Sequence, residues 1–292
     1  MPSNTSNKPG TLYVVATPIG NREDITLRAV RILGEVDIVA AEDTRHTGRF
    51  LSYHSIKANL VSYHEHNEKE RTSSLIKRLH SGSSVALVSN AGTPSVSDPG
   101  YTLIKSAIDN GIPVIPVPGV SAAIAALSVA GLPTDSFVFV GFPPRKKQKR
   151  LSQLKRLANE EKTLVFYESP RRILTLLDEM ISIMGDRYGV LSREMTKLHE
   201  EFIRGSLTEI LHALKERPSV KGECTLLVTG FQEEAVAVES IRKEIKKELE
   251  TPGSRLSDIA KIIAKKYGLS KKTVYDEALK LKRNMQGPSR KA

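Results

Sequence analysis

The segment 89–100 constrains the fold of this chain more than any other stretch of its sequence. It follows the apolar run Val85–Val88, so the pattern predicts a buried strand that opens into a loop of Gly, Pro and small hydroxyl residues. Glycine has no side chain and proline fixes φ, so a ligand can come close to such a backbone. A second strand with a similar loop, 114–121, precedes a helix of small residues, Ala122–Ala130. Two such openings indicate a ligand-binding crevice at the carboxyl ends of parallel strands, and two ordinary tight turns explain them equally well.

Strand and helix patterns alternate along the chain, which is typical of an α/β fold with a doubly wound parallel sheet. Strands are expected at Thr11–Ala16 and Val36–Ala41. Between them, Asp24 or Thr26 is placed to cap a helix whose apolar face we expect to hold Leu27, Val30 and Leu33. Further helices are expected at 71–80, 151–157, 170–180, 207–214 and 238–249, and further strands at 137–142, 163–167, 190–193, 200–204 and 225–229.

These patterns predict two α/β domains and a small helical appendage. We expect a disordered lead-in over 1–10, an N-terminal α/β domain over 11–133, a second α/β domain over 134–232, a charged linker helix over 233–254 and a basic helix-turn-helix-like module over 255–292. In that module, an apolar stripe from Leu256 to Ala264 is followed by Ser270, a candidate cap for a second helix that carries Val274 and Ala278. A helical hairpin that packs or dimerises fits the same pattern.

Cysteine content and hydropathy predict a soluble cytoplasmic protein. The single cysteine, Cys224, excludes an internal disulfide and a cysteine-rich metal site, and its apolar neighbours favour a buried structural thiol. No apolar run approaches the roughly 20 residues that span a bilayer. His64 and His66 are placed to lie on one side of a strand and to bind metal, but no third ligand is evident and we expect no metal site.

Positive charge is concentrated in two regions. The chain has a net charge of +11, and the part from Ile241 onward contains fifteen Lys and Arg against six Asp and Glu. A second cluster spans Arg145–Arg150, and Lys271 and Lys272 begin the last predicted helix. Clustered cations indicate a polyanionic partner such as nucleic acid, although a solvated surface also explains them.

The residues alone do not name a reaction. The chain has no P-loop lysine pattern, no Gly-x-Gly-x-x-Gly after the first strand, no His-Glu-x-x-His and no nucleophile elbow.

An ordered set of motifs resembles a known superfamily. The motifs are Thr17–Asn21, Glu42–Arg45, Ala91–Gly100, Pro118–Ser121, Phe166–Arg172, Arg193–Glu200 and Gly222-Glu223. Together they resemble the tetrapyrrole methylases and, within them, the bacterial ribosomal RNA small-subunit methyltransferase I group. The resemblance covers about 11 to 231.

The resemblance implies a two-domain methyltransferase that binds S-adenosyl-L-methionine between its domains and acts as a homodimer. Its implied reaction is methylation of a cytidine ribose 2′-hydroxyl in the decoding region of 16S rRNA, on the RNA or the assembled small subunit. The residues implied to bind the cofactor are Pro18, Asn90, Ala91, Gly92, Thr93, Pro94, Ser121, Ala122, Tyr167 and Glu168. Asn90 departs from the family, which usually has Asp there, and an amide can still hydrogen-bond.

Carboxylates in the matched motifs are candidates to activate the ribose hydroxyl, which is a poor nucleophile until its proton is accepted. We place Glu194 and Lys197 at the reacting hydroxyl, and Asp43 with Glu42 and Arg45 at the substrate mouth; Asp98 is a further candidate. An ion pair between Asp43 and Arg45 that only braces the loop is equally consistent. The residues expected to contact RNA are Arg45, Arg145, Lys146, Lys147, Lys149, Arg150, Lys271 and Lys272.

Two alternatives remain open from the sequence. The first is a C-methyltransferase of corrin or siroheme precursors, because enzymes with the same fold catalyse that reaction, which does not need a basic C-terminal region. The second alternative is a nucleic-acid-binding regulator that binds S-adenosylmethionine as a sensed ligand and catalyses no methyl transfer.

Overall fold

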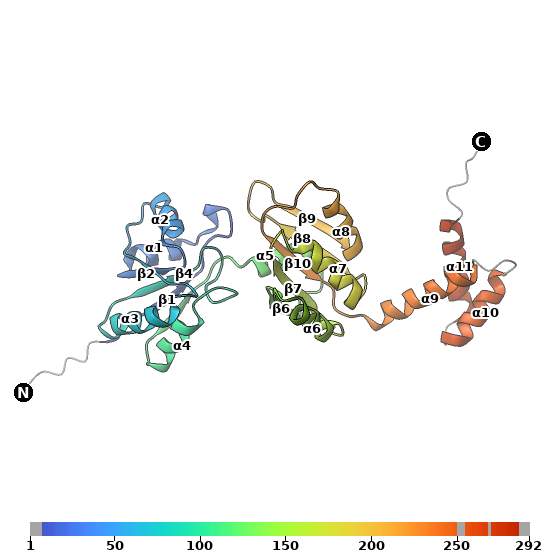
Figure 1. Ribbon diagram of the computed structural model, residues 1–292, viewed down its shortest axis with the longest axis horizontal. Helices are drawn as coiled ribbons and strands as arrows, with labels where there is room; N and C mark the ends of the chain where they lie inside the picture. The colour runs from blue at the N-terminus through green and yellow to red at the C-terminus, as the bar shows by residue number, and fades with distance from the viewer. Residues whose placement is uncertain (1–7, 250–254, 268–269, 286–292) are drawn as a thin grey trace, which may run out of the picture. The chain divides into compact units, whose positions relative to one another are not determined.

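The computed structural model describes residues 8–249, 255–267 and 270–285 (Figure 1). The chain divides into two compact units, residues 1–230 and residues 231–292. The predictions for residues 1–7, for the end of the linker helix at 250–254, and for residues 268–269 and 286–292 of the C-terminal module lie outside the described residues. The domain boundaries drawn at 133 and 232 stay predictions.

The first sheet of unit 1–230 is entirely parallel, with the strand order β3-β2-β4-β1-β5. Its strands are β1 (Leu12–Val15), β2 (Ile38–Ala41), β3 (Leu60–Ser62), β4 (Val85–Val88) and β5 (Val114–Val117). Its helices are α1 (Leu27–Glu35), α2 (Thr44–Tyr53), α3 (Glu68–His80) and α4 (Tyr101–Asp109). Helices α1 and α2 cover one face and α3 and α4 the other (Figure 1). The predicted α/β class with a doubly wound sheet is confirmed.

Helix α1 begins where the sequence predicted, but its buried face differs from the predicted one. The Thr26 hydroxyl accepts a hydrogen bond from the Ala29 N–H at 3.1 Å, which is an N-cap. Leu27 is 90% exposed, whereas Ala29, Ile32 and Leu33 are buried. The expected stripe was wrong at Leu27, because the buried residues at 29, 32 and 33 share a helical face that position 27 does not.

The second sheet of the same unit is mixed, with the order β6-β7-β10-β8-β9. Only β6 and β7 pair in parallel. Its strands are β6 (Phe137–Gly141), β7 (Thr163–Glu168), β8 (Tyr188–Arg193), β9 (Glu201–Ser206) and β10 (Cys224–Val228). The helices in this part of the chain are α5 (Ala122–Ala130), α6 (Lys147–Leu157), α7 (Ile173–Met184) and α8 (Leu207–Lys215).

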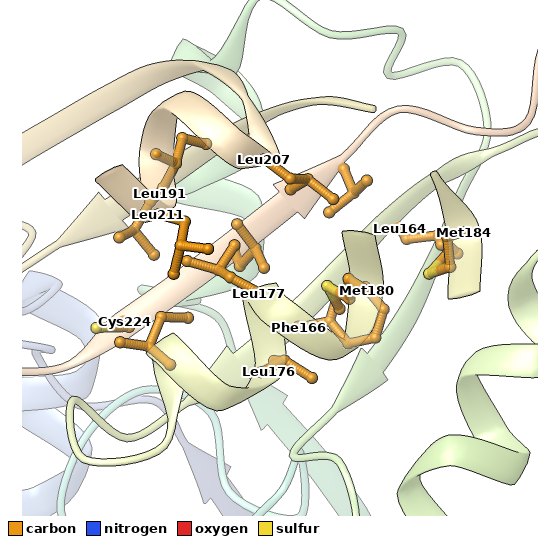
Figure 2. Close-up of a cluster of buried hydrophobic side chains, with 14 of the residues drawn as sticks. Leu164, Phe166, Leu176, Leu177, Met180, Met184, Leu191, Leu207, Leu211 and Cys224 are labelled. Carbon is orange, nitrogen blue, oxygen red and sulfur yellow. The ribbon is translucent and has the colours of Figure 1, made fainter. Parts of the chain in front are cut away.

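Alternating side chains of the second sheet build two cores. Phe166 and Leu226 point into the core with α6, α7 and α8, where Phe166 lies beside Met180 in Figure 2. Val165 and Leu227 point to the opposite face, where they pack in one cluster with α5 and with Ile19 from the loop after β1. The two sheets of this unit therefore share an apolar interface beside the loops that follow β1.

The described residues of the second unit form three helices. They are α9 (Glu233–Leu249), α10 (Leu256–Tyr267) and α11 (Lys271–Met285). Ile241 and Ile245 of α9 lie in the same core as Ile259 and Val274, so α9 belongs to the module instead of acting as the separate linker helix we expected. The Ser270 hydroxyl accepts from the Thr273 N–H at 3.0 Å, as the predicted cap does. In the described residues, no helix is long and apolar enough to cross a membrane.

Candidate active site

The loops that follow β1 and β4 are joined directly to each other. The Thr17 N–H donates to the Gly92 carbonyl and the Gly92 N–H to the Thr17 carbonyl, both at 2.9 Å. Gly92 has a φ of +75°, and Ser95 and Ser97 also adopt positive φ values. Such conformations are costly for residues with a side chain and concentrate at ligand sites. Two cavities open beside this pair of loops.

The first, which we call the small-residue cavity, has a volume of about 350 Å³. It is lined by Ile19, Ala91, Gly92, Thr93, Val96, Ser97, Asp98, Ser121, Ala122, Phe142, Tyr167, Glu168, Ser169, Pro170, Met195, Gly222, Glu223, Cys224 and Thr225. The loops after β4 and β5 and the ends of β7 and β10 supply most of these residues. Both sheets of the unit therefore contribute to its wall.

Tyr167 links β7 of the second sheet to α5 at this cavity. Its hydroxyl oxygen accepts a hydrogen bond from the Ala123 N–H in the first turn of α5, at 3.0 Å. The rings of Phe139 and Phe142 contact the Tyr167 ring edge-on, with centroids 5.0 and 5.6 Å away. Burial raises the pKa of Tyr167 above its ordinary value, so the phenol is neutral at physiological pH.

Asp98 lines the small-residue cavity and has a raised pKa. Burial and, after it, repulsion from the Glu42 carboxylate raise the pKa of Asp98 to about 6, with the Ser89 hydroxyl offsetting part of the shift. A carboxyl with this pKa is ionised at neutral pH and is a stronger base than an exposed one. Glu42 itself accepts a hydrogen bond from the Asn90 N–H at 3.1 Å.

Glu168 and Cys224 are fixed parts of the cavity wall. Glu168 is buried, pairs with Arg172 at 2.7 Å and accepts from the Ser169 N–H at 2.7 Å. Burial raises the pKa of Cys224 to about 12, so the thiol is not a nucleophile. The sequence-based interpretation of Cys224 as a buried thiol is confirmed.

The second cavity, which we call the cationic cavity, has a volume of about 430 Å³. It is lined by Thr17, Pro18, Ile19, Gly20, Arg22, His46, Thr47, Arg49, Phe50, Ser89, Asn90, Ala91, Lys197 and Glu223. Ile19, Ala91 and Glu223 line both cavities, so the two meet at these residues.

A loop from the second sheet reaches the cationic cavity at a glycine. A Cβ on Gly20 would lie 2.5 Å from Cγ of Lys197 and 3.0 Å from the Met195 carbonyl oxygen, so only glycine fits there. The neighbouring Asn21 N–H donates to the Thr196 hydroxyl at 3.0 Å. The loop between β8 and β9 is therefore packed directly on the loop after β1.

Lys197 and Glu194, which we placed at the reacting hydroxyl, form an ion pair at this loop. Lys197 Nζ lies 2.8 Å from Glu194 Oε1 and 3.0 Å from Glu223 Oε2. The hydrogen bond from Lys197 holds the pKa of Glu194 below its ordinary value. Burial alone would lower the pKa of Lys197, but its hydrogen bonds to Glu194 and Glu223 leave it raised. Lys197 lines the cationic cavity and Glu194 lines neither cavity.

Asp43 caps a helix and lines neither cavity. Its Oδ1 accepts from the Arg45 N–H at 2.8 Å and from the His46 N–H at 3.2 Å, which makes it the N-cap of α2. Both hydrogen bonds lower the pKa of Asp43, and the one from the His46 N–H has the larger effect. Both donors hold the Asp43 carboxylate at the helix start, which favours the structural alternative, and the catalytic role of Asp43 stays a prediction. Arg45 is exposed, 3.9 Å from Asp43, on the surface beside α2.

The other residues predicted to bind the cofactor divide between the cavities. The small-residue cavity receives Ala91, Gly92, Thr93, Ser121, Ala122, Tyr167 and Glu168. Pro18 and Asn90 line the cationic cavity, and Pro94 lines neither. Arg22, Arg49, Phe142, Cys224 and Thr225 were not predicted as site residues, and Gly222-Glu223 was given only as a family motif without a role, because the local sequence does not show which distant loops these residues meet.

Of the predicted RNA contacts, Arg150 is wrong. It is 8% exposed, and its guanidinium donates to both carboxylate oxygens of Glu179, at 2.6 and 2.8 Å, and to the Pro144 and Arg145 carbonyls. The arginine therefore fixes the loop before α6 and has no donor directed to solvent phosphates. Exposed cations remain at Arg145, Lys146, Lys147 and Lys149, and at Lys271 and Lys272 where α11 begins.

The two histidines considered as metal ligands lie in a loop and not on a strand. His64 and His66 follow the end of β3, with ring centroids 5.9 Å apart. Over residues 8–249, 255–267 and 270–285, no three His, Cys, Asp or Glu side chains converge on a metal site.

Comparison with known proteins gives consistent matches. The family model of tetrapyrrole (corrin/porphyrin) methylases matches residues 11–211. The chain is 52% identical over 221 residues to a ribosomal RNA small subunit methyltransferase I of Halalkalibacterium halodurans, which covers 76% of each chain. It is 43% identical over 277 residues to the protein of the same name from Escherichia coli O157:H7, with 94% of this chain and 96% of that one covered.

Two solved structures share the fold. A cobalt precorrin-4 methyltransferase superposes with a TM-score of 0.58 at 19% identity, over 75% of this chain and 94% of that one. The uroporphyrin-III C-methyl transferase from Thermus thermophilus, solved with S-adenosyl homocysteine, gives 0.53 at 22% identity, over 78% of this chain and all of that one.

Proposed function

The chain belongs to the tetrapyrrole (corrin/porphyrin) methylase family, and from that premise we propose that it methylates the ribosomal RNA of the small subunit. It is an S-adenosylmethionine-dependent methyltransferase. The relatives that are 42–52% identical over most of the chain all carry the name ribosomal RNA small subunit methyltransferase I, and this agreement is the observation that carries the proposed substrate.

The small-residue cavity fits S-adenosylmethionine. Its volume of about 350 Å³ lies within the range of roughly 300–1,000 Å³ that is usual for small-molecule sites. Gly92, Ala91 and Ala122 leave the backbone accessible, while Tyr167 and Phe142 offer aromatic surface to a cationic sulfur. When bound, the cofactor supplies an electrophilic methyl group on a sulfonium sulfur.

Within this proposal, the acceptor is a ribose 2′-hydroxyl of a cytidine in the decoding region. A new C–O bond forms as the C–S bond breaks, the electron pair of the C–S bond stays on sulfur, and the hydroxyl proton needs an acceptor. We assign that role to Asp98. Asp98 lines the small-residue cavity, and the Ser89 hydroxyl, which lowers its pKa, lines the cationic cavity. With a pKa of about 6, Asp98 is ionised at neutral pH.

Glu194 and Lys197 are positioning residues in this scheme. Lys197 is protonated and paired with Glu194 and Glu223, so it cannot accept the proton, and the Glu194 carboxylate is already engaged. Their ion pair holds the loop between β8 and β9 over Gly20, where the two cavities meet. The pair therefore shapes the site and contributes charge beside the acceptor.

RNA recognition by exposed cations, homodimer formation and a cytoplasmic location are further parts of the proposal. The cations at 145–149 and at Lys271 and Lys272 are exposed, as phosphate contacts require. A ribosomal substrate places the enzyme where small subunits are assembled.

The experiment is transfer of label from S-adenosylmethionine to small subunits purified from a strain that lacks this gene. Label confined to one 2′-O-methylcytidine of the decoding region, mapped by nuclease digestion, is the expected result. Tight cofactor binding without label on subunits or free ribosomal RNA contradicts the proposal. Label on a tetrapyrrole precursor offered in parallel would replace it by the reaction of the corrin enzymes.

A further inference from the structure

The cationic cavity lies beside the cavity that we assign to S-adenosylmethionine, and its lining has the chemistry of a nucleotide site. Resting on the proposed function, we propose that this cavity receives the target nucleotide, with Arg22 and Arg49 on its phosphate, Phe50 against its base and Asn90 at its ribose. Each part of this assignment follows from a separate feature of the lining.

The two arginines are free to bind an anion. In the part of the chain that the structure describes, neither Arg22 nor Arg49 pairs with a carboxylate, although both side chains line the cavity and are exposed. The Arg22 guanidinium lies 4.7 Å from the centre of the Tyr53 ring, and the Arg49 Nε donates to the Arg45 carbonyl at 3.4 Å. These contacts orient both groups while leaving N–H donors available, and guanidinium groups bind phosphate oxygens in pairs.

The charge of the lining favours a phosphate over a neutral ligand. Arg22, Arg49 and Lys197 contribute three positive charges, and Glu223 is the single carboxylate among the lining residues. That carboxylate is already paired with Lys197 at 3.0 Å. An anion that enters the cavity therefore meets two arginines whose charge is not neutralised.

The remaining lining distinguishes a nucleotide from a free phosphate. Phe50, which is half-buried, and Pro18 are the apolar ring side chains of the lining, and we assign the base of an unpaired nucleotide to them. The side-chain oxygen of Asn90 is buried and has no hydrogen-bond partner among the described residues. A buried acceptor without a donor is costly, and a ribose hydroxyl supplies the missing donor.

The position of the cavity fits a substrate of the methyl transfer. The two cavities share Ile19, Ala91 and Glu223, and Asn90 precedes Ala91 directly. A ribose held at Asn90 therefore lies at the boundary with the cofactor cavity. The phosphate at Arg22 and Arg49 lies on the solvent side, where the rest of the RNA chain continues.

The first test compares Arg22→Ala/Arg49→Ala with Arg78→Ala, a matched exposed arginine of α3 that lines neither cavity. We expect the double variant to keep the wild-type dissociation constant for S-adenosylmethionine, measured by calorimetry. The concentration of small subunits that half-saturates single-turnover methylation should rise by about tenfold or more. The slope of the logarithm of the RNA-binding constant against the logarithm of the salt concentration should fall in magnitude by about 1–2. Equal behaviour of the double variant and Arg78→Ala overturns the proposal.

The second test concerns the ribose end of the cavity. Asn90→Ala should lower the methylation rate at saturating subunits by about tenfold, as expected for loss of a hydrogen bond of about 1.4 kcal/mol in a positioned complex. Its half-saturating subunit concentration and its cofactor affinity should stay near the wild-type values. Asn90→Asp, which keeps an acceptor, should restore most of the rate. A wild-type rate in Asn90→Ala overturns the placement of the ribose at this residue.

These outcomes separate the inference from the proposed function. If wild-type protein transfers no label to small subunits, the proposed substrate fails before any variant is compared. If wild-type protein is active and the arginine variants behave like Arg78→Ala, only the assignment of the cationic cavity fails. Unchanged melting temperatures of all variants establish that the effects arise from binding and not from unfolding.

Discussion

The two cavities lie next to each other in one unit but differ in the side chains that line them. The small-residue cavity is formed by glycines, alanines and short hydroxyl side chains, together with the half-buried Tyr167 and the buried Glu168, each of which already has a partner in the protein. The cationic cavity also has small residues in its lining but adds three cationic side chains, among which Arg22 and Arg49 have no acidic partner in the described residues.

This difference corresponds to two kinds of ligand. A compact cofactor that is enclosed by protein needs close backbone approach and a fixed shape. A nucleotide within a long RNA needs charge that is available before docking, and exposed arginines provide it at low cost in desolvation. The comparison predicts that changes in one cavity leave binding at the other intact.

The largest effect that sharpens this comparison is expected at Asp98. Asp98→Asn removes the proton acceptor, and the single-turnover rate should fall by about 100-fold or more. Because the acceptor must be ionised, the wild-type rate should fall below pH 6, by about tenfold at pH 5, and this dependence should disappear in the variant.

Asp109→Asn, an exposed carboxyl of α4, serves as the control for this substitution. If the single-turnover rate of Asp98→Asn still falls as the pH is lowered below 6, a group other than Asp98 accepts the hydroxyl proton. A loss of S-adenosylhomocysteine affinity as large as the loss of rate would make Asp98 a cofactor ligand instead.

An intermediate effect is expected from filling the small-residue cavity. Ala122→Leu should weaken S-adenosylmethionine binding by about tenfold to 100-fold, because overpacking costs about 1–3 kcal/mol. Titration calorimetry measures this change, and RNA binding without cofactor should not change. Ser128→Leu adds the same side chain to an exposed position of α5 and should leave cofactor affinity as it is. Weakened RNA binding by Ala122→Leu would break the separation of the two cavities.

The smallest effect is expected at the contact between β7 and α5. Tyr167→Phe leaves the Ala123 N–H without its acceptor, which costs about 1 kcal/mol and corresponds to roughly fivefold in cofactor affinity. Tyr188→Phe, on an exposed tyrosine of β8, is the matched substitution. Cofactor binding that is identical in Tyr167→Phe and Tyr188→Phe would mean that the hydrogen bond does not hold the cavity in shape.

Local patterns in the sequence predicted most of the elements. The strands β1, β2 and β4 and the helix α5 were expected within one or two residues of their observed bounds, because apolar runs and Gly-Pro loops mark strand ends clearly. Helix α2 was interpreted as part of a loop, since its segment 44–53 is polar and contains Gly48. Nothing in its spacing indicates that the Asp43 carboxylate caps it.

The pattern of charged residues predicted which side chains are exposed less well than the pattern of apolar residues predicted which are buried. Arg150 belongs to a run of five cations in six residues, and the sequence does not distinguish it from Lys149. Its partner Glu179 lies on α7, and the packing of α6 against α7 brings the two together with both side chains about nine-tenths buried. Likewise, α9 has a charged sequence, yet Ile241 and Ile245 join the core of its unit.

The family motifs in the sequence were sufficient to identify an S-adenosylmethionine-dependent methyltransferase, and seven of the residues predicted to bind the cofactor line one cavity. Those residues are close in the chain to the loops that form the cavity, so short-range order carries the information. Division of the site into two cavities depends on contacts between distant segments, such as Gly20 with Lys197 and Ala123 with Tyr167. Such contacts form only when both sheets have folded and packed, because no local preference sets the distance between residues that lie far apart in the chain.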